Sequence, residues 1–233
     1  MSLEDFGRET FFLSHLKVSL DPLWFDFRSI PVTLIEFFMS DAQFVSLSQV
    51  LTNLADIPAE EAARLYEIGK KKSVKKGELF IRSGEVPGKF AFVHSGLFRY
   101  LYTNEEGKQF TKGFMPQFLF LSSYSAMIQN TPSWFCIEAL EDSLIIEFDY
   151  HSWMELKASS FHWDRFLIAM LERGYTIKET RERELLLLDA ESRYKIFLDR
   201  YPGLEQRVKQ HMIASYLGVT PESLSRIRKK IHH

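Results

Sequence analysis

The C-terminal stretch of the chain, residues 210–231, carries the pattern that most constrains the fold. Its apolar residues form two short sets with helical spacing, which are Ile213 and Leu217, then Leu224, Ile227 and Ile231. Gly218 lies between the sets, where glycine tolerates the positive φ of a tight turn. Thr220 is a favoured N-cap, and Pro221 suits the first position of a helix. This arrangement predicts a helix-turn-helix.

The second predicted helix has two distinct faces. Opposite Leu224 lie four polar residues at i, i+3, i+4 and i+7, which are Glu222, Ser225, Arg226 and Lys229. An Arg can donate two hydrogen bonds to guanine, a Glu can accept one from cytosine, and a Lys neutralises phosphate. We therefore expect this helix to bind double-stranded DNA. The residues predicted at the interface are Thr220, Glu222, Ser223, Ser225, Arg226, Lys229 and Lys230.

The charge distribution supports the same prediction. The whole chain has a formal net charge of −2, which by itself argues weakly against nucleic acid. Residues 206–233, however, hold six basic residues and one acid, Glu222. A basic end is more often a solvated face than a binding site, so an ordinary helical hairpin with an exposed charged face remains the alternative.

The middle of the chain contains two different patterns of apolar residues. Apolar residues at spacings of three and four around Pro58 predict two short helices between Gln43 and Lys72. From Ser73 to Tyr150, short apolar runs alternate with glycines, a pattern typical of a β-sandwich or barrel.

A long helix is expected from Phe161 to Leu188. Its inward candidates are Phe166, Met170, Ile177, Glu184 and Leu188. Since apolar residues occur on more than one side, a second copy of the chain is the economical partner, with an intrachain core helix as the alternative. Another helix is expected over Ser192–Leu198, and residues 1–45 have no clear period.

Several classes of protein are disfavoured. No run of eighteen uncharged apolar residues and no signal peptide occur, so we expect a cytoplasmic protein without a membrane partner. Cys136 is the single cysteine, which excludes a cluster held by several thiolates. In the strand-rich region only His94 and His151 occur, and no nucleophile or nucleotide motif is present. We therefore expect neither an enzyme nor a metal site, with haem on a lone His left open.

Two segments resemble the Crp/Fnr family of transcription regulators. Residues 75–114 (KKGELFIRSGEVPGKFAFVHSGLFRYLYTNEEGKQFTKGF) are similar to the entry into the family's β-roll, and residues 219–230 (VTPESLSRIRKK) are similar to its recognition helix. In that helix the resemblance assigns reading of a G·C pair to Glu222 and Arg226. The resemblance spans residues 45–231.

The resemblance implies an α+β fold with an antiparallel, jelly-roll-like β-roll, a long dimerisation helix and a helix-turn-helix. The implied domains are an appendage (1–45), a cyclic-nucleotide-binding-like effector domain (46–155), a dimerisation helix (156–188) and a DNA-binding domain (189–233). It also implies a homodimer that binds DNA and contacts RNA polymerase. The alternative is a β-roll receptor that acts through protein contacts instead of DNA.

The chain departs from the family where cyclic nucleotides bind. Family members hold the ribose with a Gly-Glu pair and the phosphate with an Arg followed by Ser or Thr, whereas an ungapped alignment places Ser122-Ser123 and Ser133-Trp134 there. These four residues are the predicted effector pocket. Residues 114–140 contain no Lys or Arg, so we expect no useful binding of cyclic AMP and leave the effector unknown. The crowded aromatics of this region indicate either core or an apolar pocket.

Overall fold

The structure is a computed structural model that describes residues 41–231. All of them belong to one compact unit, Phe37–His233. The predicted appendage, residues 1–45, lies outside the described residues except for its last five. None of the helices within 41–231 is both long enough and apolar enough to cross a bilayer.

The two helices predicted around Pro58 are present. Helix α2 (Ala42–Ala55) begins at Asp41, whose side chain accepts a hydrogen bond from the backbone N–H of Gln43. Helix α3 (Ala59–Ile68) follows directly after Pro58. The prediction is confirmed because the apolar spacing matches the faces that become buried.

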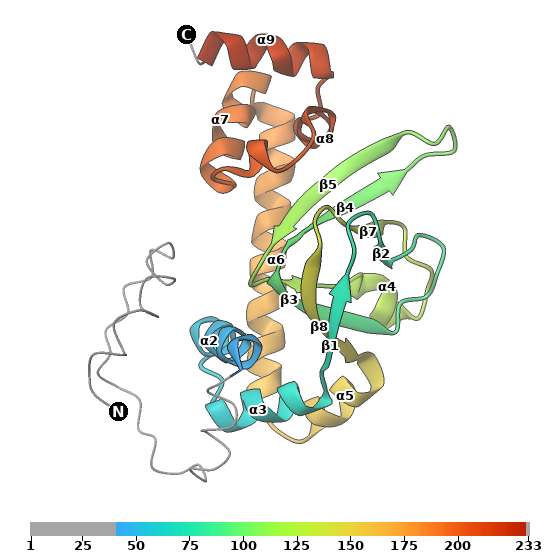
Figure 1. Cartoon of the computed structure of the whole chain (residues 1–233), viewed down its shortest axis with the longest axis vertical. Helices are drawn as coiled ribbons and strands as arrows, with labels where there is room; N and C mark the ends of the chain where they lie inside the picture. The colour runs from blue at the N-terminus through green and yellow to red at the C-terminus, as the bar shows by residue number, and fades with distance from the viewer. Residues whose placement is uncertain (1–40, 232–233) are drawn as a thin grey trace, which may run out of the picture. The chain divides into compact units, whose positions relative to one another are not determined.

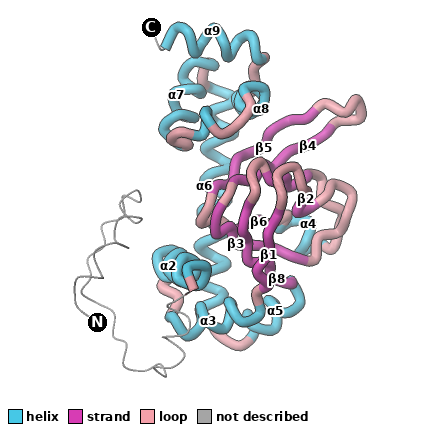
Figure 2. Tube along the Cα trace, in the orientation of Figure 1, coloured by secondary structure: helices cyan, strands magenta, loops and turns pink. Residues whose placement is uncertain are grey.

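Within residues 41–231, eight strands form two four-stranded antiparallel sheets (Figures 1 and 2). The first sheet has the order β1-β8-β3-β6, formed by Lys70–Val74, Ser143–Asp149, Lys89–Ser95 and Phe120–Leu121. The second has the order β2-β7-β4-β5, formed by Leu79–Ile81, Cys136–Ala139, Leu97–Thr103 and Gln109–Pro116. The predicted antiparallel β-roll is thereby confirmed.

Successive side chains of a strand point to opposite faces of its sheet, and in the described residues the buried side chains form three hydrophobic cores. In β3, Ala91 and Val93 face the second sheet, whereas Phe90 and Phe92 face away from it and pack with residues of α2, α3 and α6 (His162–Leu187). The outer face of the second sheet contributes Leu97 to a third cluster. Both faces of each sheet are therefore buried over part of their area, which explains the unbroken apolar runs of the sequence.

Two short helices, α4 (Tyr124–Gln129) and α5 (Tyr150–Ala158), were not predicted. Helix α4 lies between β6 and β7, inside the segment that the glycine pattern assigned to strands. Six residues are too few for helical periodicity to be recognised.

The predicted long helix is α6 (His162–Leu187), which follows α5 (Tyr150–Ala158). Phe166 and Glu184 are buried as predicted, and Met170 packs against the first core. Ile177, in contrast, is 55% exposed and Leu188 is 36% exposed, so the inward assignment of these two residues is wrong for the single chain. Along α6, Ile177 lies between the core around Phe166 and the contacts around Glu184, and it belongs to neither group of contacts.

The C-terminal part is helical. It consists of α7 (Ala190–Arg200), a 3₁₀ turn at Leu204–Gln206, α8 (Gln210–Leu217) and α9 (Pro221–Ile231). Its core contains Tyr194, Phe197, Leu217 and Leu224 and also receives Phe114 from β5. Helix α7 confirms the helix predicted over Ser192–Leu198 and extends it at both ends.

Candidate nucleic-acid interface and β-roll site

The turn between α8 and α9 has the geometry that the sequence predicted. Gly218 adopts a left-handed conformation with φ of 69°, which a side chain would disfavour. Thr220 Oγ1 accepts a hydrogen bond from the backbone N–H of Ser223 at 3.2 Å and so caps α9. Leu224 is fully buried and anchors α9 against α7 and α8. Residues 210–231 therefore form a helix-turn-helix.

The opposite face of α9 is open to solvent. Glu222, Arg226 and Lys229 are exposed, and Ser225 is half-buried. The side chains of Arg226 and Lys229 form no hydrogen bond or ion pair with any residue from 41 to 231. The pKa of the Glu222 carboxyl is lowered by its own backbone N–H and by the Thr220 hydroxyl, so this group is ionised at neutral pH. The face thus presents free donors and an ionised acceptor side by side.

Other predicted interface residues already have partners. Lys230 Nζ donates to Glu191 Oε2 of α7 at 2.5 Å, and this hydrogen bond raises the Lys230 pKa. Thr220 and Ser223 bond to each other through the cap. Lys229 is consequently the freer of the two adjacent lysines.

The predicted effector pocket divides into buried and exposed residues. Ser123 and Ser133 are buried, and their Oγ atoms are 2.8 Å apart. The Ser122 backbone N–H donates to the Tyr100 hydroxyl at 2.9 Å, whereas Ser122 Oγ is buried without a partner in the described part of the chain. Trp134 is 81% exposed. The structure thus brings the three serines together and leaves Trp134 at the surface.

Lys112 is a residue that sequence reasoning missed at this site. It lies two positions before the segment 114–140 that was searched for positive charge. Its Nζ is 4.1 Å from the centroid of the Phe135 ring, directly beside the predicted pocket. The sequence signal would have been a break at Lys112 in the alternation of inward and outward side chains along β5. A search for charged residues along the sequence does not consider this alternation.

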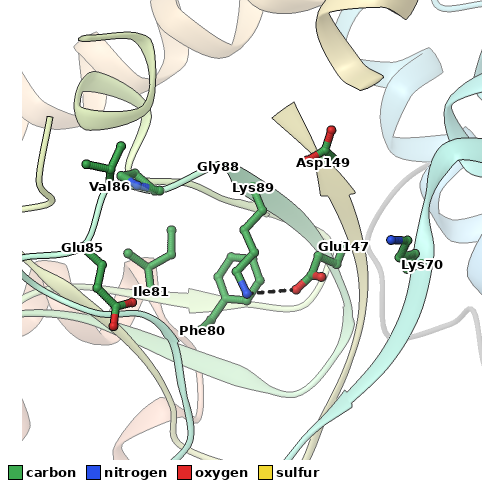
Figure 3. Close-up of a pocket in the computed structure, with 10 residues that line it drawn as sticks. Lys70, Phe80, Ile81, Glu85, Val86, Gly88, Lys89, Glu147 and Asp149 are labelled. Atoms are coloured by element: carbon green, nitrogen blue, oxygen red, sulfur yellow. Dashed lines mark hydrogen bonds and ion pairs between the residues drawn. The ribbon is translucent and has the colours of Figure 1, made fainter. Parts of the chain in front are cut away.

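A separate cavity of about 290 Å³ lies beside β1, β3 and β8 (Figure 3). Its wall includes Lys89, which donates to Glu147 Oε2 at 3.2 Å and lies 4.9 Å above the Phe80 ring. Glu85 and Asp149 add two more acids. None of the predicted effector residues lines this cavity.

The two histidines that the sequence left as possible haem ligands, His94 and His151, each lie beside a polar side chain of the protein. His94 Nδ1 is 2.9 Å from Ser46 Oγ, and burial lowers the His94 pKa. His151 is exposed and lies 3.6 Å from Glu155. Among residues 41–231, no three His, Cys, Asp or Glu side chains are placed to share a metal ion.

The β-roll and the C-terminal helical part, residues 190–231, are in direct contact. Phe114 of β5 packs edge to face on Phe197 of α7, with ring centroids 6.2 Å apart. Arg207 donates two hydrogen bonds to Glu141, at 2.9 and 2.7 Å. These contacts connect the second sheet to the helices that would bind DNA.

Comparisons with known proteins agree with this architecture. The family model for the cyclic nucleotide-binding domain matches residues 71–160. No curated protein matches the chain at a significant level of similarity.

Three solved structures represent the fold. The c-di-GMP-responsive global regulator CLP of Xanthomonas campestris has a TM-score of 0.62 at 17% identity, over 75% of this chain and 92% of its own. FixK2 of Bradyrhizobium japonicum has a TM-score of 0.61 at 20% identity, over 71% and 85%. A Eubacterium rectale protein assigned to the Crp/Fnr family of transcriptional regulators has a TM-score of 0.60 at 16% identity, over 76% and 84%. Residues 71–160 are therefore a cyclic nucleotide-binding-type domain, and the chain has the fold of the Crp/Fnr family of transcription regulators.

Proposed function

We propose that this protein is a dimeric, sequence-specific DNA-binding transcription regulator of the Crp/Fnr type. The single observation that carries the proposal is the two-sided helix α9. On one side of α9, Leu224 is buried in the core of the C-terminal helices. On the other side, Glu222, Arg226 and Lys229 are exposed to solvent. A recognition helix needs both a face that fixes it to its domain and a face that reaches base edges.

A second copy of the chain is the partner proposed for α6. Its exposed apolar residues Ile168, Leu171, Tyr175 and Leu185 lie 3, 4 and 10 residues apart, and the last interval is the sum of steps of 3, 4 and 3. This stripe is distinct from the side that carries Trp163 and Phe166, which is already buried in the chain's own core. A parallel helix pair would cover the stripe and place two α9 helices on one side of a duplex.

The remaining parts of the proposal follow from these two. We assign the β-roll, residues 46–155, as the effector domain, residues 156–188 as the dimerisation helix and residues 189–233 as the DNA-binding domain. The role is regulatory and not enzymatic, in the cytoplasm where bacterial DNA lies. Contact with RNA polymerase stays a prediction of the family resemblance.

Selection of bound sequences from a random DNA pool tests the proposal. We expect a pseudo-palindrome with half-site centres about 10 base pairs apart, because the two helices must enter successive major grooves. Retention should weaken as salt rises, because lysines release counterions from phosphates. If no sequence is enriched and no salt-dependent retention is seen, a β-roll receptor acting through protein contacts replaces this proposal.

A further inference from the structure

A β-bulge in β5 directs Lys112 to the inner face of its sheet. Tyr100 of β4 pairs with Gly113, whereas the next residue, Leu101, pairs with Thr111, so Lys112 is the extra residue. Tyr100 packs against the core between the two sheets, and Phe135 is a member of that core. Such bulges re-aim a single side chain and occur frequently beside functional sites.

Three aromatic rings surround the Lys112 ammonium. Its Nζ lies 4.1 Å from the centroid of Phe135 and 5.8 Å from the centroids of both Tyr100 and Tyr102. Ring faces attract a cation but do not neutralise its charge. No acid lies within ion-pairing distance of Lys112 among the described residues.

The charge of a second lysine acts on Lys112. Burial lowers the Lys112 pKa, and repulsion from Lys178 of α6 lowers it further. Lys178 has no ion-pair partner within 41–231, and both lysine side chains are exposed in the single chain. An anion is favoured beside two ammonium groups that lack acidic partners, because its negative charge offsets the repulsion between them.

We propose that Lys112 binds the acid group of a small organic anion, whose apolar body lies against the exposed ring of Tyr102, and that the positive charge of Lys178 strengthens this binding. The Tyr102 residue is 40% exposed, which leaves ring surface available. The buried and unpartnered Ser122 Oγ lies near the hydroxyl end of Tyr100 and adds an unused polar group to the same region. The assignment of this anion as an effector rests on the proposed regulatory function, but its binding does not.

The same bulge connects this site with the helix-turn-helix. Thr111, immediately before Lys112, donates its backbone N–H to Ser215 Oγ of α8 at 2.8 Å. Movement of Lys112 toward a ligand would act on the backbone that makes this bond. The site therefore lies one residue from a direct contact with the DNA-binding helices.

The test uses two aromatic probes that differ in charge. The full-length protein is titrated by calorimetry with 1-naphthoate and with its neutral counterpart, 1-naphthamide. We expect naphthoate to bind at least about tenfold more tightly, because hydrogen bonds to charged groups contribute more than neutral ones. Equal affinities, or binding of neither probe, would overturn the proposal.

Variants identify the groups responsible. Lys112→Met should abolish the preference for naphthoate and Lys178→Met should reduce it, whereas Lys112→Arg should retain it and show that the charge, not the fold, was lost. Lys108→Met is the matched control, because Lys108 lies 5.3 Å above Phe110 on the same hairpin and should leave both affinities unchanged. A preference that survives Lys112→Met refutes the site.

The outcome is independent of the proposed function. Arg226→Ala should retain naphthoate binding, since Arg226 belongs to α9. A protein that binds naphthoate but no DNA would keep the site and refute the regulator. A protein that binds DNA but shows no preference for naphthoate would refute the site alone.

Discussion

The Ser215 hydroxyl of α8 accepts a hydrogen bond from the backbone N–H of Thr111 in β5, at 2.8 Å. This contact joins a strand of the β-roll to the first helix of the helix-turn-helix across 104 residues of sequence. Because Thr111 is the residue before the Lys112 bulge, the ladder with β4 is irregular at this point. A side chain of the helical part thus satisfies a backbone group of the sheet.

Replacing Ser215 should loosen this contact. We expect Ser215→Ala to lower the free energy of unfolding by about 1 kcal/mol, because the partly buried Thr111 N–H loses its acceptor. Denaturant unfolding measures the change. Thr176→Ala is the control, since the Thr176 hydroxyl bonds only within its own exposed helical turn. An unchanged free energy for Ser215→Ala would contradict the structural role of this bond.

Glu184 should make stability depend on pH. It is buried between Arg181 and Arg200; burial raises its pKa, the Arg200 and Arg181 contacts lower it, and the net shift is downward. A carboxyl with a lowered pKa stabilises the fold above its ordinary pKa of 4.5, and this contribution is lost as the pH falls through the folded-state value.

Glu184→Gln tests this relationship. The variant should lose about 3 kcal/mol at pH 7, because it leaves two partly buried arginines without their counter-charge. It should also lose less stability than the wild type when the pH falls below 4.5, the ordinary value for the group. Glu179→Gln, at an exposed position of the same helix, should retain the wild-type pH profile.

The exposed stripe of α6 should determine the oligomeric state. Light scattering should give twice the chain mass of 27.4 kDa for the wild type. Leu171→Asn should shift the protein toward monomer, because an amide at the centre of the seam is desolvated without a partner. Thr176→Asn, on the same helix but outside the stripe, should leave the dimer intact. A monomeric wild type at micromolar concentration would refute the proposed interface.

The face of α9 should separate sequence reading from general affinity. Arg226→Ala should cost about 1 to 3 kcal/mol on the preferred site and relax the choice at one G·C pair in each half-site. Lys229→Ala should weaken binding to all sequences alike and lower the salt slope by about one unit per monomer. Fluorescence anisotropy on preferred and scrambled DNA distinguishes the two effects. An equal loss on both DNAs for Arg226→Ala would refute the assignment of this helix.

Cyclic AMP should not bind with useful affinity. Ser123 and Ser133 are buried and bonded to each other at positions where family members hold the ribose and the phosphate. Calorimetry should show a dissociation constant weaker than about 100 μM. A low micromolar value with the nucleotide seated in the β-roll would show that this reasoning is wrong.

The amino-acid sequence by itself determined the local elements. The spacing of Ile213, Leu217 and Leu224 with Gly218 and Thr220 predicted the helix-turn-helix, and α8 and α9 have that arrangement. The long helix and the strand-rich character of residues 73–150 were predicted as well. These features depend on neighbours within a few residues, so periodicity and caps are sufficient to identify them.

Only the tertiary structure decided which side chains meet. It paired Lys230 with Glu191, left Ile177 exposed and buried the serines expected to line a pocket. It also turned Lys112 onto Phe135 through a bulge. Each outcome depends on strand register or helix packing across tens of residues, because a shift of one residue in a strand moves a side chain to the opposite face.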